Sequence, residues 1–153
     1  MAIISANVAD QIRTFFADNL QDPVTVELFT QKPSPLVVPG RHECEYCQET
    51  EDLLSEVVAL SPKLSLDVHD LRADAGSGAA EKISEDMVPA IILHGHDRGK
   101  LRFFGIPAGN EFSTLIQDIA DVSKGSTALS EDTVDQLANL TSDVHIRVFV
   151  TPT

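Results

Sequence analysis

The chain has 153 residues, enough for one domain with a hydrophobic core, and its 42% apolar content argues against disorder. Eleven Lys and Arg residues against 24 Asp and Glu residues give a net charge of −13. Such an acidic surface repels phosphates, so we expect neither nucleic acid nor a membrane as a partner. The N-terminal sequence lacks the long apolar run of a secretory signal, and no segment is apolar enough to span a bilayer. We therefore expect a cytoplasmic protein.

The first 60 residues predict a helix, a buried strand, a long loop and a second helix. The apolar residues four positions apart that predict the first helix, over residues 6–20, are Val8, Ile12, Phe16 and Leu20. Residues 24–30 are β-branched and apolar, which is typical of a buried strand. Three prolines and a glycine between residues 31 and 43 predict a loop, and a helix is expected from Cys44 to about Leu60.

Strands are expected to dominate the middle of the chain. Apolar and polar residues alternate over residues 64–68, which predicts a strand. A short helical stretch is expected around residues 79–83. Two further strands, 89–94 and 100–104, are separated by a Gly-containing turn and predict a hairpin.

The C-terminal third predicts two more helices, capped by Asn110 and Ser130, and a final strand over residues 144–150. This last strand repeats the apolar pattern of residues 24–30 position for position. We interpret the last helix and strand as a second copy of the first two elements.

The only two cysteines, Cys44 and Cys47, stand three positions apart, too close together to staple a fold. On a helix this spacing puts both sulfur atoms on one face. At the start of a helix, unpaired amides and the helix dipole favour a thiolate, which is the reactive form of cysteine. The pattern therefore indicates thiol–disulfide exchange, with Cys44 as the attacking thiol and Cys47 as the resolving thiol.

Two other interpretations of the cysteines stay open at this point. They could be an inert buried pair, or they could bind a metal together with His42 and either His94 or His96. Structural zinc sites usually use a second closely spaced ligand pair, which the chain lacks. We therefore expect no metal and no cofactor.

Four segments resemble the glutaredoxin-like protein disulfide oxidoreductases of thermophilic prokaryotes, which are tandem proteins with two thioredoxin-like units. The matching segments are Cys44–Cys47, Val88–Ala90, Phe104–Phe112 and Val148–Thr153. The resemblance implies an α/β fold, with a thioredoxin-like mixed sheet flanked by helices. It assigns residues 1–125 to the thioredoxin-like domain. Residues 126–153 form a helix–strand extension that resembles the start of a second unit.

The resemblance also implies site residues and a function. It predicts a cis Val88–Pro89 peptide facing the sulfur atoms, with Tyr46, Val88 and Pro89 contacting the substrate. The expected function is that of a dithiol–disulfide oxidoreductase acting on protein disulfide substrates, with an unidentified electron donor, as a monomer or homodimer. Classical glutaredoxins bind glutathione with basic groups and a Gly-Gly-x-Asp turn, whereas this chain has Gly105-Ile-Pro-Ala-Gly109, so glutathione dependence is not expected.

The loop over residues 31–43 is longer than the corresponding connection in that family. It therefore supports an alternative function: a redox-inactive thioredoxin-like module that uses this loop to dock a partner. Glu27 is the odd charged residue in an apolar strand, and we expect it at an edge or in solvent. His69 and His94 are also expected to face solvent.

Overall fold

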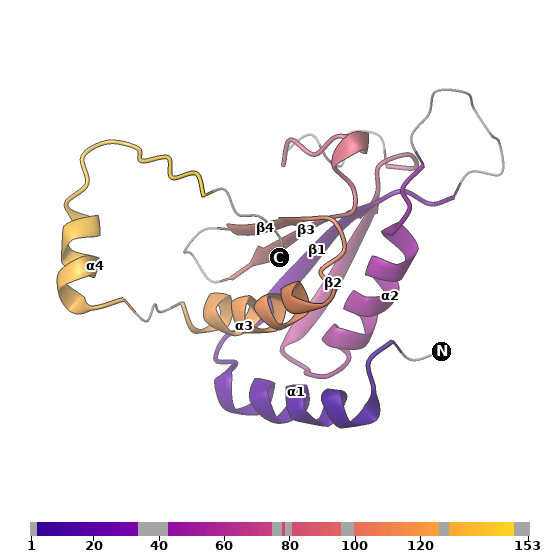
Figure 1. Cartoon of the computed structure of the whole chain (residues 1–153), viewed down its shortest axis with the longest axis horizontal. Helices are drawn as coiled ribbons and strands as arrows, with labels where there is room; N and C mark the ends of the chain where they lie inside the picture. Colours follow the sequence, from indigo (N-terminus) through magenta and orange to yellow (C-terminus); the bar gives the residue numbers. More distant parts are fainter. Residues whose placement is uncertain are drawn as a thin grey trace.

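The computed structural model describes residues 3–33, 43–74, 78, 81–95, 100–125 and 129–148. In chain order the elements in these ranges are α1 (Ala6–Asn19), β1 (Val24–Thr30), α2 (Cys47–Val58), β2 (Leu64–Asp70), a 3-10 helix η1 (Glu85–Met87), β3 (Ala90–His94), β4 (Lys100–Phe104), α3 (Asn110–Lys124) and α4 (Glu131–Ala138). Figure 1 shows α1, α2 and α3 packed around one sheet, and α4 standing apart from them.

The sheet has four strands in the order β2-β1-β3-β4. Strands β1 and β2 are parallel and joined through α2, whereas β3 runs antiparallel to both β1 and β4. A strand–helix–strand unit followed by an antiparallel hairpin is the mixed arrangement that the sequence predicts. The predicted α/β thioredoxin-like fold is therefore confirmed.

The main hydrophobic core lies between one face of this sheet and helices α1, α2 and α3. Alternate residues of β1 point into it and are fully buried: Val24, Val26 and Leu28. Phe16 of α1, Leu54 of α2 and Leu115 of α3 meet these strand residues from the helical side. The strand periodicity of two thus assigns the intervening positions of β1 to the opposite face.

The opposite face carries a smaller core, in which Phe29 of β1 packs with Ile83, Ala90 and Ile92. The chain between β2 and β3 covers it, with η1 as its short helix. The helix predicted around residues 79–83 is wrong in its described part, because residues 81–83 are not helical and Lys82 has φ 57°. A positive φ cannot continue a right-handed helix.

Two helix starts differ in detail from the expectation, and a third agrees with it. Helix α2 begins at Cys47 rather than Cys44, because Tyr46 at its N-cap has the non-helical angles φ −114° and ψ 12°. Asn110 is the first residue of α3 and not its cap, a position that Gly109 takes with φ 59°. Ser130 caps α4 as predicted, since its side chain accepts a hydrogen bond from the Thr133 amide.

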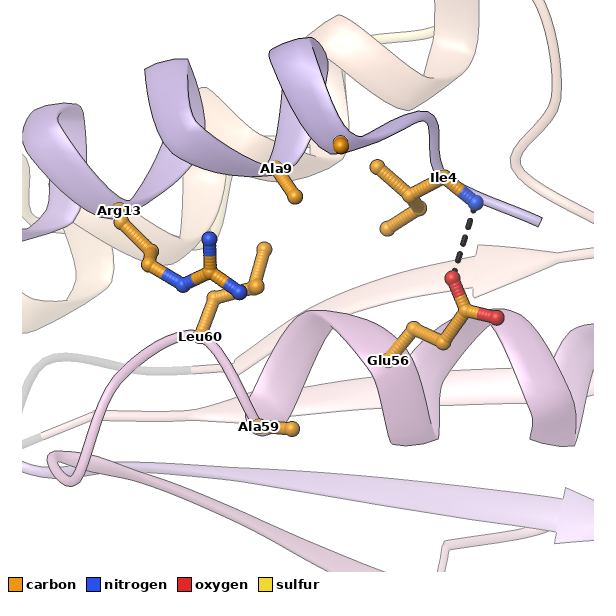
Figure 2. A pocket seen from close by; sticks show the side chains of 7 residues that line it. Ile4, Ala9, Arg13, Glu56, Ala59 and Leu60 are labelled. Atoms are coloured by element: carbon orange, nitrogen blue, oxygen red, sulfur yellow. Dashed lines mark hydrogen bonds between the residues drawn. The ribbon is translucent and has the colours of Figure 1, made fainter. Parts of the chain in front are cut away.

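The segment before α1 is held against α2 by a carboxylate. The amides of Ile3 and Ile4 donate to the two oxygens of Glu56, at 2.7 and 2.8 Å. Figure 2 shows the Ile4 contact beside an open hollow between α1 and α2, with Arg13 and Leu60 on its wall. The hydrogen bonds lower the pKa of Glu56.

The strand predicted over residues 144–150 is not formed in its described part, 144–148. These residues have no regular secondary structure, and Val144, Ile146 and Val148 are 60–79% exposed. A strand needs a neighbour for its backbone groups, and the described sheet ends at β2 and β4 without one from this segment. Within the ranges given above, no helix is long and apolar enough to cross a membrane.

Candidate active site

Cys44 and Cys47 are joined by a disulfide, with their Cα atoms 5.6 Å apart. Cys47 is the first residue of α2 and only 2% exposed, whereas Cys44 lies three residues before the helix and is half-buried. The two halves of the disulfide therefore differ in access, and Cys44 is the more open one.

The start of α2 lies directly beside the disulfide. The Thr50 amide donates to the Tyr46 carbonyl at 3.0 Å, which is the first hydrogen bond of the helix. The three preceding amides, of residues 47–49, have no partner within the helix, as at every helix start. Cys44 lies in the turn that leads into these amides rather than in the helix, which corrects the predicted placement.

The end of β1 positions the inner sulfur. The Gln31 amide donates to the Cys47 Sγ atom at 3.3 Å, and Gln31 itself is 3% exposed. A hydrogen bond from a buried amide favours the thiolate form of a reduced sulfur. The side chain of Gln31 continues to the η1 segment, where its Nε2 donates to the Glu85 carboxylate at 3.2 Å.

The Val88–Pro89 peptide bond is cis. The antiparallel register pairs Phe29 with Ala90, so Pro89 lies beside Thr30 at the end of β1, one residue before Gln31. Pro89 is buried and Val88 is half-buried. The two residues therefore lie at the same end of the sheet as the disulfide.

Tyr46, between the cysteines, is 46% exposed. A hydrogen bond with Glu45, and the charge of that carboxylate, raise the pKa of Tyr46 above its usual value. Its phenol therefore remains protonated at neutral pH, on an exposed aromatic side chain of a residue that lies between the two cysteines in the chain.

Glu27 lies in the central strand β1, which corrects the expectation of an edge or solvent position. Its carboxylate oxygens lie 3.0 Å from His69 Nε2 and 2.7 Å from His94 Nε2, and its side chain is 20% exposed. The His69 ring also stacks on Phe29, with ring centroids 5.0 Å apart. Neither His69 nor His94 is therefore a simple solvent-facing residue.

Glu27 is not placed to transfer a proton to or from Cys47. It precedes Gln31, whose amide contacts the Cys47 sulfur, by four residues of extended chain, which is about 13 Å.

The metal-binding interpretation of the cysteines involved His42 and His96, which lie outside the described residues. Within the described ranges, no group of three or more His, Cys, Asp and Glu side chains could hold a metal ion. Two residues that the sequence did not single out act near the disulfide: Gln31 donates to Cys47 Sγ, and Arg72 binds Glu43, the residue before Cys44.

A solved protein disulfide oxidoreductase from Aeropyrum pernix has the same fold. It superposes with a TM-score of 0.71 and 26% identity, over 89% of this chain and 55% of that one. This chain therefore has a thioredoxin-like fold and is similar in sequence to a protein disulfide oxidoreductase. The alkyl hydroperoxide reductase protein AhpF of Enterococcus faecalis also shares the fold. That structure has a TM-score of 0.71 and 19% identity, over 90% of this chain and 61% of that one.

No family model matches the chain, but two kinds of curated protein are similar to most of it. The AhpF protein of the alkyl hydroperoxide reductase from Staphylococcus aureus is 29% identical over 111 residues, 71% of this chain and 19% of that protein. An NADH dehydrogenase from Ferdinandcohnia aciditolerans is 28% identical over 113 residues, 69% of this chain and 22% of that protein. The chain thus spans about a fifth of the length of these relatives.

Proposed function

We propose that this protein is a dithiol–disulfide oxidoreductase that exchanges disulfides with protein substrates through Cys44 and Cys47. The observation that carries this proposal is the Cys44–Cys47 disulfide itself, with one half open and the other buried at the start of α2. An attacking thiol needs access to a substrate disulfide, and a resolving thiol needs only access to its partner.

In the reducing direction, the Cys44 thiolate attacks one sulfur of the substrate disulfide. The substrate S–S bond breaks, the leaving thiolate takes up a proton, and a mixed disulfide with Cys44 forms. Cys47 then loses its proton and attacks the Cys44 sulfur, which releases the second substrate thiol and closes the Cys44–Cys47 disulfide. Two electrons pass from the protein to the substrate. One proton comes from Cys47 and the other from solvent, which took it up when the Cys44 thiolate formed. The reverse sequence oxidises a substrate dithiol.

The substrate contacts are proposed at Tyr46, Val88 and Pro89. Tyr46 offers an exposed aromatic ring beside the sulfur atoms. Val88 and Pro89 lie at the same end of the sheet, where the backbone of Val88 can pair with an extended substrate chain. We place the activity in the cytoplasm, where thiols are kept reduced and such disulfides are transient.

The proposal is tested by the reduction of insulin with dithiothreitol, followed as turbidity. The wild-type protein is expected to accelerate the reaction, and the Cys44→Ser and Cys44→Ser/Cys47→Ser variants are expected to run at the uncatalysed rate. Circular dichroism of each variant provides the control for folding. Equal rates with the wild type and the double variant would instead support the binding-module alternative.

The names of the AhpF relatives favour a second, narrower role, in which the dithiol supplies electrons for the reduction of an alkyl hydroperoxide. Reduction of one hydroperoxide to alcohol and water consumes the two electrons and two protons of one dithiol. Loss of free thiols from the reduced protein in the presence of cumene hydroperoxide measures the direct reaction. Loss that requires an added peroxide-reducing protein would indicate electron transfer between partners.

A further inference from the structure

The guanidinium of Arg72, just after β2, joins three segments around the disulfide. Its Nη1 and Nη2 atoms bind both oxygens of Glu43, at 3.1 and 3.3 Å. Nη1 also donates to the Lys32 carbonyl at 3.2 Å, and Nε lies 3.9 Å from the Glu85 carboxylate. Arg72 therefore connects the chain leaving β1, the residue before Cys44, and η1.

These contacts reach the disulfide from both sides. On one side, Glu43 precedes Cys44 directly in the chain. On the other, the Glu85 carboxylate accepts a hydrogen bond from Gln31, whose amide donates to Cys47 Sγ. The positions of both cysteines are thus linked to one arginine, on the Cys44 side through hydrogen bonds with Glu43 and on the Cys47 side through the 3.9 Å ion pair with Glu85.

The same arginine also changes the electrostatics of the site. Glu43 and Glu45 flank Cys44, and a neighbouring carboxylate disfavours a thiolate. The two-point contact with Arg72 neutralises the charge of Glu43. Because the Arg72 side chain is only 11% exposed, solvent and salt screen its charge less than that of a surface arginine.

We propose that Arg72 is a positioning residue for the cysteine pair, which holds Glu43 in place and keeps its negative charge from opposing the Cys44 thiolate. The inference rests on the proposed function for its biological meaning. In this proposal, Arg72 stabilises the reduced form of the protein and makes the attack by Cys44 faster. A lysine cannot replace this arginine fully, because an ammonium group does not present two parallel donors to a carboxylate.

The test begins with Arg72→Met. The pKa of Cys44 is measured from the thiolate absorbance at about 240 nm as a function of pH. In this variant the pKa is expected to be higher than in the wild type, so that at a pH below the pKa the thiolate fraction is about tenfold smaller. The equilibrium constant for reduction by glutathione is expected to fall by up to the same factor, which corresponds to about 30 mV. Arg72→Lys is expected to fall between the wild type and Arg72→Met.

A double-mutant cycle with Glu43→Gln separates charge neutralisation from general structural support. In the Glu43→Gln background, Arg72→Met is expected to change the pKa of Cys44 far less, because no carboxylate remains to be neutralised. Glu43→Gln alone is expected to lower this pKa, since Arg72 then faces the site without its main counterion. This single variant tests the inference even where Arg72→Met does not fold.

Arg13→Met is the matched control, because Arg13 also pairs with an acid, Asp10, but lies on the surface of α1. It is expected to leave the pKa and the equilibrium constant unchanged. The inference is overturned if Arg72→Met shifts both quantities by less than twofold, or shifts them equally with and without Glu43. Neither readout requires a protein substrate, so a wild type inactive on insulin would reject the proposed function and leave this result standing.

Discussion

At the scale of residues, the two cysteines have different environments and should react differently. Cys47 is 2% exposed, and its sulfur accepts a hydrogen bond from the backbone amide of Gln31. Cys44, by contrast, is half-buried in the segment before α2. Reactivity towards a dissolved reagent depends on both thiolate character and access. The Cys47 sulfur has the hydrogen bond that favours a thiolate, but a dissolved reagent cannot reach it easily. Accessibility therefore decides which cysteine reacts first.

In the reduced protein, we expect iodoacetamide at neutral pH to label Cys44 at least about tenfold faster than Cys47. Mass spectrometry of the tryptic peptides after timed quenching measures the two rates. In concentrated urea the rates should become similar, which is the control for intrinsic reactivity. Faster labelling of Cys47 in the native protein would reverse the assigned roles.

Sequence reasoning identified the cysteine pair because its spacing and its place before a helix are local features. It missed Gln31 and Arg72, because each reaches the site only through the fold. Gln31 is 16 residues from Cys47, and Arg72 is 29 residues from Glu43. The parallel pairing of β1 with β2 puts Arg72 just beyond the end of β1, and no pattern within either segment indicates this neighbour.

At the scale of elements, two carboxylates join segments that are distant in the sequence. Glu56 of α2 accepts from the amides of Ile3 and Ile4, and Glu81 pairs with Lys100 and Arg102 of β4. Both carboxyl groups have a lowered pKa in the folded protein. Each therefore contributes stability above its unfolded pKa and loses it as the pH falls through the folded value.

Glu56→Gln is expected to lower the melting temperature at pH 7, because an amide is a weaker acceptor for two backbone donors than a carboxylate. The difference from the wild type should shrink as the pH falls through the lowered pKa of Glu56, where the carboxylate becomes protonated. Thermal unfolding by circular dichroism between pH 3 and 7 measures it, with Glu51→Gln in the same helix as the control. A constant difference across this range would contradict the role of the charge.

Glu81 is expected to remain charged to lower pH, because its hydrogen bonds with Lys100 and Arg102 lower its pKa to about 2. Glu81→Gln should therefore reduce the melting temperature across the range from pH 4 to 7. The loss should be smaller in 1 M NaCl, since salt screens ion pairs at a surface. Lys100→Met removes one of the two partners and should give a smaller loss than Glu81→Gln. A loss of the same size in low and high salt would argue against the ion pairs.

The elements that the sequence predicted well are those whose pattern agrees with their burial. The strands β1, β3 and β4 and the helices α1 and α3 form close to the expected ranges. The helix predicted around residues 79–83 is wrong in its described part, because Lys82 adopts a backbone conformation that no periodicity indicates. The strand predicted over residues 144–150 is wrong in its described part, 144–148, for another reason. Its sequence pattern is that of a buried strand, but burial requires a neighbouring strand or helix that the pattern does not supply.

At the scale of the whole molecule, we propose that residues 1–125 form the thioredoxin-like domain and that residues 126–153, which include α4, form a separate extension. Figure 1 shows α4 apart from the sheet and its helices. The large apolar side chains that this extension leaves at least 41% exposed are Leu129, Val134, Leu137, Leu140, Val144, Ile146 and Val148. Their exposure forgoes roughly 1.5–3 kcal/mol for each side chain that could otherwise be buried.

Deleting residues 129–153 tests the relation of this extension to the body. We expect the melting temperature to change little, because no described residue of the extension belongs to either hydrophobic core. We also expect the full chain to associate with rising concentration, because these exposed apolar side chains favour contact with another chain. Light scattering should show that the shortened chain stays monomeric, and that Ile146→Asp with Val148→Asp weakens association of the full chain. A shortened chain that melts several degrees lower would show instead that the extension packs on its own domain.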